Sequence, residues 1–283
     1  MSDALTIAGY ALREAVRRRV LLVVALLTAV FLGLFALGAF EAFDSLEQSS
    51  ADVPIDEQAL TGGTLLGLAM FVALFLGVVL AVFLTLDAVR GDAERGLLQP
   101  LVVRPVGRTT LLAGRLLAAS AVCASYVVIV FLAAAVITQA AGDFTPSSLF
   151  VPAAGLALGV VTVVAVSLLG STVLSTTANG IAVFMVFATG LAGGLLGQIG
   201  EGLQVEALEQ ASSIMSWIVP FEALYQNGLH ALTADIGGAA GVIVQLGPFG
   251  GASDVSAGIW LWAVAWSAAV LALAALAFKR RDL

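Results

Sequence analysis

The chain has 283 residues, of which 60% are hydrophobic and only 11% are charged, and its formal net charge is −7. An average soluble domain carries roughly 25% charged residues, so this composition leaves too little polar surface for a water-soluble protein. Together with a mean hydropathy of +1.07, it excludes a soluble enzyme and predicts an all-α membrane protein that crosses the bilayer several times.

The first 19 residues combine basic and apolar side chains ahead of the first apolar run. Leu5 and Leu12 recur near helical spacing, whereas Arg13 and Arg17 lie on another side. The pattern predicts an amphipathic helix over 1–19 that rests on the inner leaflet, with its bases near anionic head groups. An ordinary basic flank of the first spanning helix is the alternative.

Six apolar runs follow, each long enough to cross roughly 30 Å of hydrocarbon as a helix. Backbone groups cannot stay unpaired in lipid, so we expect all six runs to be helical. The sequence therefore predicts one transmembrane domain. The predicted spans are 20–40, 64–86, 116–138, 151–174, 180–199 and 259–278.

The positions of the 12 lysines and arginines set the expected orientation. All of them fall within 13–19, 90–115 and 279–281. Basic residues in short connections stay cytoplasmic, and six crossings place both termini and the connection between the second and third helices on one side. We therefore expect cytoplasmic termini in an inner or plasma membrane. Because the bases are spread over three edges, a nucleic-acid-binding face is not expected.

The longest outer connection, 201–258, carries two short apolar helical pieces that meet at Pro220, where a proline breaks or starts a helix. Neither piece is long enough to span the bilayer. We expect both to dip into the outer leaflet, with Trp217 and Tyr225 near the head-group level.

Three pairs of glycines are spaced by four residues, which allows helices to approach closely in lipid. Packing within one subunit is the expected use, and a seam between two subunits is the alternative. The pairs are Gly63 and Gly67, Gly155 and Gly159, and Gly193 and Gly197.

The cytoplasmic connection, 87–115, is short, charged and rich in proline and glycine. Leu97, Leu98 and Leu101 give it an apolar side. Exposed leucines between charges suit docking onto a cytosolic protein. The alternative is that the connection packs beneath the bundle and its bases only set the topology.

Three segments of this connection and of the start of the third span form a recognisable pattern: Glu94-Arg95-Gly96-Leu97-Leu98, Arg104-Pro105-Val106-Gly107-Arg108 and Leu111-Leu112-Ala113-Gly114-Arg115-Leu116. The pattern resembles that of the ABC-2 type permeases, the membrane subunits of ATP-binding-cassette exporters. The chain departs from their usual pattern at Leu97, where threonine is common, and at Gly107, where serine is common. The layout of six helices with a long outer connection before the last one also fits. Among these permeases it looks most like the stand-alone branch that includes the permease for copper-site maturation of nitrous oxide reductase.

The resemblance implies that two permease subunits, identical or different, pair above two separate ABC ATPase subunits. The chain has no G-x-x-x-x-G-K-[ST] phosphate loop, and its only lysine is Lys279, so ATP and Mg²⁺ are expected on the partner and this chain is not expected to be an enzyme. No cofactor is expected on it. The residues expected to dock onto the ATPase are Glu94, Arg95, Gly96, Leu97, Leu98, Leu101, Arg104 and Arg108.

Two other classes of function stay open. One is a membrane anchor or sensor that recruits a cytosolic partner without transporting anything. The other, an intramembrane enzyme, is disfavoured because Glu222, Gln226 and the only histidine, His230, are expected to form just a polar stripe on a loop helix. Uncharged spans also argue against proton coupling. Apolar pathway walls would suit lipids, hydrophobic peptides or amphipathic drugs, or a protein that only transmits force.

Overall fold

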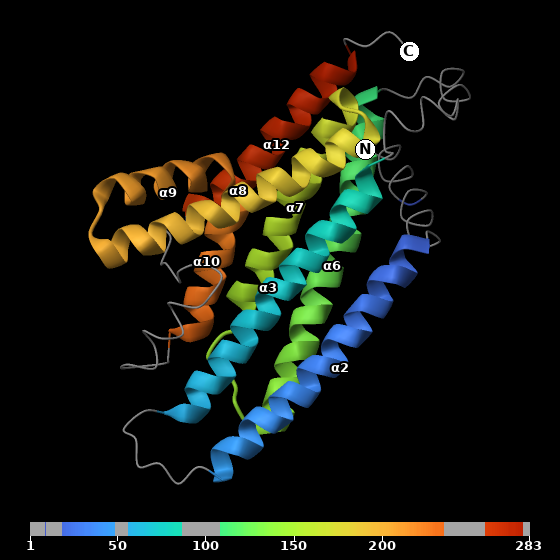
Figure 1. Cartoon of the computed structure of the whole chain (residues 1–283). Coiled ribbons are helices and arrows are strands. Elements are labelled where there is room, and N and C mark those ends of the chain that lie inside the picture. The colour runs from blue at the N-terminus through green and yellow to red at the C-terminus, as the bar shows by residue number, and fades with distance from the viewer. Residues whose placement is uncertain (1–8, 10–18, 49–55, 87–107, 235–257, 280–283) are drawn as a thin grey trace.

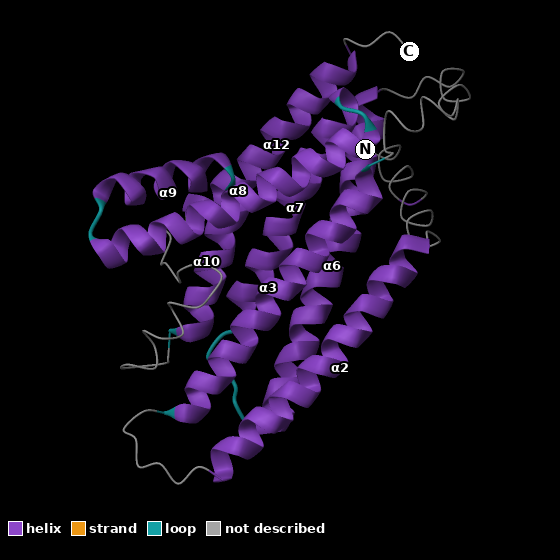
Figure 2. Cartoon of the chain, in the orientation of Figure 1, coloured by secondary structure: helices purple, strands orange, loops and turns teal. Residues whose placement is uncertain are grey.

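The computed structural model describes residues 9, 19–48, 56–86, 108–234 and 258–279, and every element within these ranges is a helix. Six helices are long and apolar enough to cross a membrane, which confirms the predicted all-α architecture with six spans (Figure 1 and Figure 2). The spanning helices are α2 (Arg19–Gln48), α3 (Glu57–Thr85), α6 (Arg108–Gly142), α7 (Phe150–Val173), α8 (Thr176–Leu203) and α12 (Gly258–Lys279). Two shorter helices, α9 (Glu206–Ile218) and α10 (Pro220–Thr233), lie between α8 and α12 in the chain.

Several spanning helices continue beyond the apolar runs, because capping groups and backbone conformation decide where a helix ends. α3 begins well before the predicted start at residue 64, since the carboxylate of Asp56 accepts a hydrogen bond from the amide of Ala59 at 2.9 Å. The C-terminal ends of α6 and α8 are followed by Asp143 and Gln204, which have left-handed backbone with φ of 49° and 54°. Such a left-handed residue is a common helix terminator.

α3 and α7 form the centre of the bundle. In the most apolar part of α3, 61% of the residues are buried, against 11% in α2. α7 contacts α3, α6, α8, α10 and α12, whereas α2 contacts α6 and α3 at the edge. The apolar side chains that α2 leaves exposed, such as Leu22 and Leu37, are those expected to face lipid.

Successive spans run in opposite directions, so each end of the bundle contains the starts of three spanning helices and the ends of the other three. At one of the two ends, α2, α6 and α8 begin and α3, α7 and α12 end (Figure 1). We call this the loop end, because the connection between α3 and α6 leaves from it, and the opposite end the far end. The predicted surface helix over 1–19 lies outside the described residues except for Gly9 and Arg19.

Candidate functional site

The predicted docking residues lie mostly outside the part of the chain that the structure describes. Arg108 is the first residue of α6, and its side chain is not among those described. The two ends of the connection, Leu86 after α3 and Arg108, lie at the loop end of the bundle. The docking role stays a prediction for all eight residues, Arg108 included. The residues outside the described ranges are Glu94, Arg95, Gly96, Leu97, Leu98, Leu101 and Arg104.

A buried hydrogen-bond network joins α3, α7 and α8 at the loop end. The hydroxyls of Thr85, the last residue of α3, and Ser167 are hydrogen-bonded, with their oxygens 2.5 Å apart. Asn179 Nδ2 donates to the Ser167 carbonyl at 3.0 Å. All three side chains are at most 1% exposed, and Gly170 leaves the space that Asn179 Oδ1 occupies. Hydrogen bonds between helices hold their relative positions in lipid, so the end of α3 is tied to the start of α8.

An open groove of about 570 Å³ lies between the end of α3 and the start of α8, beside this network. Its walls are apolar apart from the hydroxyls of Thr176 and Thr177. Such a lining suits an acyl chain or an apolar side chain and offers nothing to pair with a charged group. The lining residues are Val82, Phe83, Leu86, Thr176, Thr177, Gly180, Ile181, Phe184, Met185 and Ala188.

The structure confirms two helices that meet at Pro220, but it places them differently from the prediction. Eleven of the 14 residues of α10 are buried, and none of the 13 residues of α9 is. Tyr225 is 1% exposed and meets Phe71 edge-on, so its predicted position at the head-group level is wrong. Trp217 of α9 is 53% exposed and packs against Trp262 of α12. α10 is therefore part of the core, whereas α9 packs mainly against α8.

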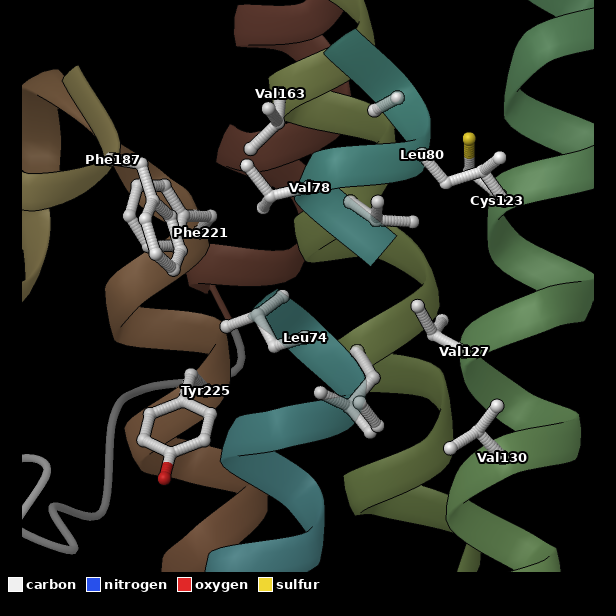
Figure 3. Close-up of a cluster of buried hydrophobic side chains, with 14 of the residues drawn as sticks. Leu74, Val78, Leu80, Cys123, Val127, Val130, Val163, Phe187, Phe221 and Tyr225 are labelled. Carbon is white, nitrogen blue, oxygen red and sulfur yellow. The ribbon is translucent and has the colours of Figure 1, made fainter. Parts of the chain in front are cut away.

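Figure 3 shows how α10 enters the main cluster of buried apolar side chains. Phe221 stacks on Phe187 of α8, with ring centroids 5.1 Å apart. Tyr225 belongs to the same cluster as Leu74 and Val78 of α3. Burial of aromatic side chains of this size makes a large apolar contribution, which explains why a helix too short to span the bilayer is held inside the bundle.

Glycines of α7 and α8 leave the space that α10 occupies, and we call Gly155, Gly159 and Gly194 together the glycine seat. A side-chain carbon at Gly155 of α7 would lie 2.8 Å from the carbonyl oxygen of Leu224, and one at Gly159 would touch Phe221 at 3.6 Å. On α8, a side chain at Gly194 would overlap Glu222. Gly193 and Gly197 in turn lie against α9, and Gly67 of α3 against α10. For Gly67 and for the other two pairs, these contacts confirm the predicted packing within one chain.

Glu222 is 2% exposed. The prediction that it belongs to a polar stripe on an outer loop helix is therefore wrong, because the side chain is buried in the bundle. Gln226 Nε2 donates to Glu222 Oε1 at 3.4 Å, while Oε2 is buried without a hydrogen-bond partner. Burial raises the pKa of Glu222, and the hydrogen bond from Gln226 lowers it by a smaller amount. The glycine spacing in the two neighbouring spans is the sequence signal that could have located this buried helix.

His230 lies two turns further along α10, and its Nδ1 is also buried without a partner. Within the described ranges, no three histidine, cysteine, aspartate or glutamate side chains come together as metal ligands would. Glu222 and His230 are therefore separate polar groups in an apolar bundle.

A family model described as ABC-2 family transporter protein matches residues 5–283, almost the whole chain. A search of curated proteins gives no match. The matched region includes both the connection between α3 and α6 and the two short helices α9 and α10.

Proposed function

The chain belongs to the ABC-2 transporter family, and from this we propose that it is the permease subunit of an ATP-binding-cassette exporter. It is a multi-pass membrane protein. In the proposed assembly it lies in the inner or plasma membrane with its termini and docking connection in the cytoplasm. Two permeases, identical or different, pair above two ABC ATPase subunits, which bind ATP and Mg²⁺.

The observation that carries this proposal is the network at the loop end. Thr85 ends α3, directly before the docking connection, and is bonded to Ser167, which also holds Asn179. Motion of the ATPase that displaces the connection would displace the end of α3, and the network would pass the displacement to the start of α8. The groove between these two helices would then change shape.

The chemistry of the groove narrows the class of substrate. Its walls provide apolar contacts and two threonine hydroxyls, Thr176 and Thr177. Transfer of a charged group into such surroundings is costly unless the charge is paired. We therefore propose an apolar or amphipathic substrate whose apolar part enters the groove from the side of the membrane.

The docking surface is tested with the substitution Leu98→Asp. A buried aspartate carries a large desolvation cost in an apolar contact, so the amount of ATPase that co-purifies with the variant should be at least tenfold lower than with the wild-type chain. The variant should still insert into the membrane normally. Tagged protein purified from its native membrane in mild detergent, assayed for bound ATPase by mass spectrometry and for ATP hydrolysis, provides the measurement.

Leu98→Met is the matched control, because methionine keeps the apolar volume at the same position, and it should retain the partner. Two outcomes contradict the proposal. A wild-type chain that purifies without any nucleotide-hydrolysing protein would favour the anchor or sensor, and a Leu98→Asp variant with normal partner binding would remove this leucine from the docking surface.

A further inference from the structure

The carboxyl of Glu222 lies deep inside the bundle, at a place that the proposed coupling does not use. Its neighbour Phe221 stacks on Phe187 and touches Gly159, which is close to the middle of α7. Glu222 itself lies against Gly194 of α8. The carboxyl is therefore far from both ends of the bundle, at a level where the spanning helices are apolar.

The spanning helices around α10 offer no charge that could pair with a carboxylate. α3, α7, α8 and α12 all contact α10, and none of them has an ionisable side chain over its apolar length. The one lysine or arginine in these four helices is Lys279, the last residue of α12. An ionised Glu222 would therefore have no counter-ion among the described residues of these helices.

The short helices do not supply a counter-charge either. On α9, Glu206 and Glu209 are exposed and carry the same sign of charge. On α10 itself, burial and the charge of Glu222 both raise the pKa of Tyr225, so this side chain supplies no positive charge. His230 is two turns away. The carboxyl has one weak donor, Gln226, and one oxygen with no partner.

Burial at this place costs much more free energy for a carboxylate than for a neutral carboxylic acid. An unpaired carboxylate in an apolar interior loses its hydration without compensation, and such a group instead binds a proton. The fit is also steric, because Gly194 is the residue that makes room for the Glu222 carboxyl. Because Glu222 Oε2 is buried and has no hydrogen-bond partner, we expect that a carboxylate here could be hydrated only if α10 moved.

We propose that Glu222 is a proton-binding site, and that α10 keeps its seat between α7 and α8 only while the proton is bound. When the proton leaves, the carboxylate must reach water, and α10 withdraws from the glycine seat to allow it. The ligand of this site is a proton, and the site responds to the pH on the side of the membrane to which α10 opens. This inference does not rest on the proposed ATPase partner.

The direction of the pH dependence follows from the direction in which burial moves the pKa. Burial raises the pKa of Glu222 above its ordinary value of 4.5. The seated state therefore binds a proton that the open state releases, so seating is most favourable in acid and weakens as the pH rises through the raised pKa. Coupling to one proton gives a change of at most about tenfold in the open population per pH unit.

A cysteine beside Glu222 tests the proposal. Ala223 is 1% exposed, so Ala223→Cys in a Cys123→Ala background is protected from a water-soluble maleimide while α10 is seated. Its labelling rate, divided by the rate in the denatured chain at the same pH, should rise by up to about tenfold per pH unit in alkaline buffer. Adding Glu222→Gln, which cannot ionise, should make that ratio independent of pH.

Glu209→Gln is the matched control, because it removes an exposed acid from the adjoining helix and should leave the pH dependence unchanged. An equal pH dependence with Glu222 and with Glu222→Gln would overturn the proposal. So would protection that persists at all pH values in the chain with Glu222.

A second measurement uses the chain with its natural sequence, and so does not depend on any variant folding. Dicyclohexylcarbodiimide is apolar and reacts with protonated carboxyls, so in membranes it should add to the peptide that contains Glu222 at mildly acidic pH and much less in alkaline buffer. Mass spectrometry of the digested protein reads this out. No adduct at Glu222, or equal amounts at both pH values, would contradict the proposal.

Discussion

Individual polar side chains matter in this bundle because few occur within it, and several of them join two helices. Tyr126 of α6 and Thr28 of α2 are hydrogen-bonded through their hydroxyls. Thr28 already donates its hydrogen to the carbonyl of Val24 at 2.8 Å, so the tyrosine hydroxyl must be the donor in the contact between helices. This bond helps to hold the peripheral helix α2 against the core.

We expect Tyr126→Phe to loosen this contact, at a cost of about 1 kcal/mol, since hydrogen bonds between helices in membranes typically contribute this order of energy. Cys123, one turn away and 0% exposed, can serve as the probe. Its reaction with a maleimide in detergent should begin at a lower temperature in the variant. Ser125→Ala is the control, because Ser125 is exposed and bonds only within its own helix; an equal effect there would contradict the assignment.

At the scale of elements, the main feature is the packing of the short helix α10 against the glycines of two spanning helices, α7 and α8. α7 and α8 carry glycines where α10 crosses them, and the backbone of α10 comes close to Gly155. Close approach of backbones in lipid requires small residues. A short helix can therefore lie within the core of a six-span bundle without forcing the spanning helices apart.

The substitution Gly155→Ala tests this packing. The added methyl group would meet the carbonyl oxygen of Leu224 at 2.8 Å, and backbone atoms cannot rotate away as a side chain can. We expect a loss of about 1–3 kcal/mol, typical of an overfilled core, seen as a lower unfolding temperature in detergent.

Gly33→Ala is the matched control for this prediction, because a methyl group at Gly33 of α2 would meet nothing within 4 Å. Alanine also has the higher helix propensity, so this variant should be as stable as the unmodified chain or slightly more so. A Gly155→Ala protein as stable as the control would show that α10 is not seated closely on α7.

At the scale of the whole molecule, the orientation in the membrane decides what the two ends of the bundle can contact. The bases of the chain cluster in three stretches, which predicts that the loop end faces the cytoplasm. The proposed docking of an ATPase requires that orientation. The far end would then carry the connection between α6 and α7 outside the cell membrane.

Two single cysteines in a Cys123→Ala background test the orientation. In intact cells, an impermeant maleimide should label Ser147→Cys, in the exposed connection between α6 and α7. It should label Leu98→Cys only after the cells are permeabilised. The reverse pattern would invert the topology and leave the docking connection on the wrong side for ATP.

Much of the fold could be predicted from the sequence because a spanning helix is a local property. About 20 consecutive apolar residues are enough to identify one, and the positions of the bases give the expected orientation. The helix ends were less predictable, since caps such as Asp56 lie outside the apolar runs. The resemblance to ABC-2 permeases also rests on local motifs, and the family match agrees with it; the narrower branch stays a prediction.

The tertiary structure alone decided which groups are buried together. The composition of α10 resembles that of a surface helix, and only its contacts with α3, α7 and α8 make it part of the core. For the same reason the sequence wrongly predicts Glu222 on an outer loop helix, and it gives no sign of the bond between Thr85 and Ser167. The environment of a side chain depends on residues far away in the sequence, and the periodicity of one segment carries no information about which helices will surround it.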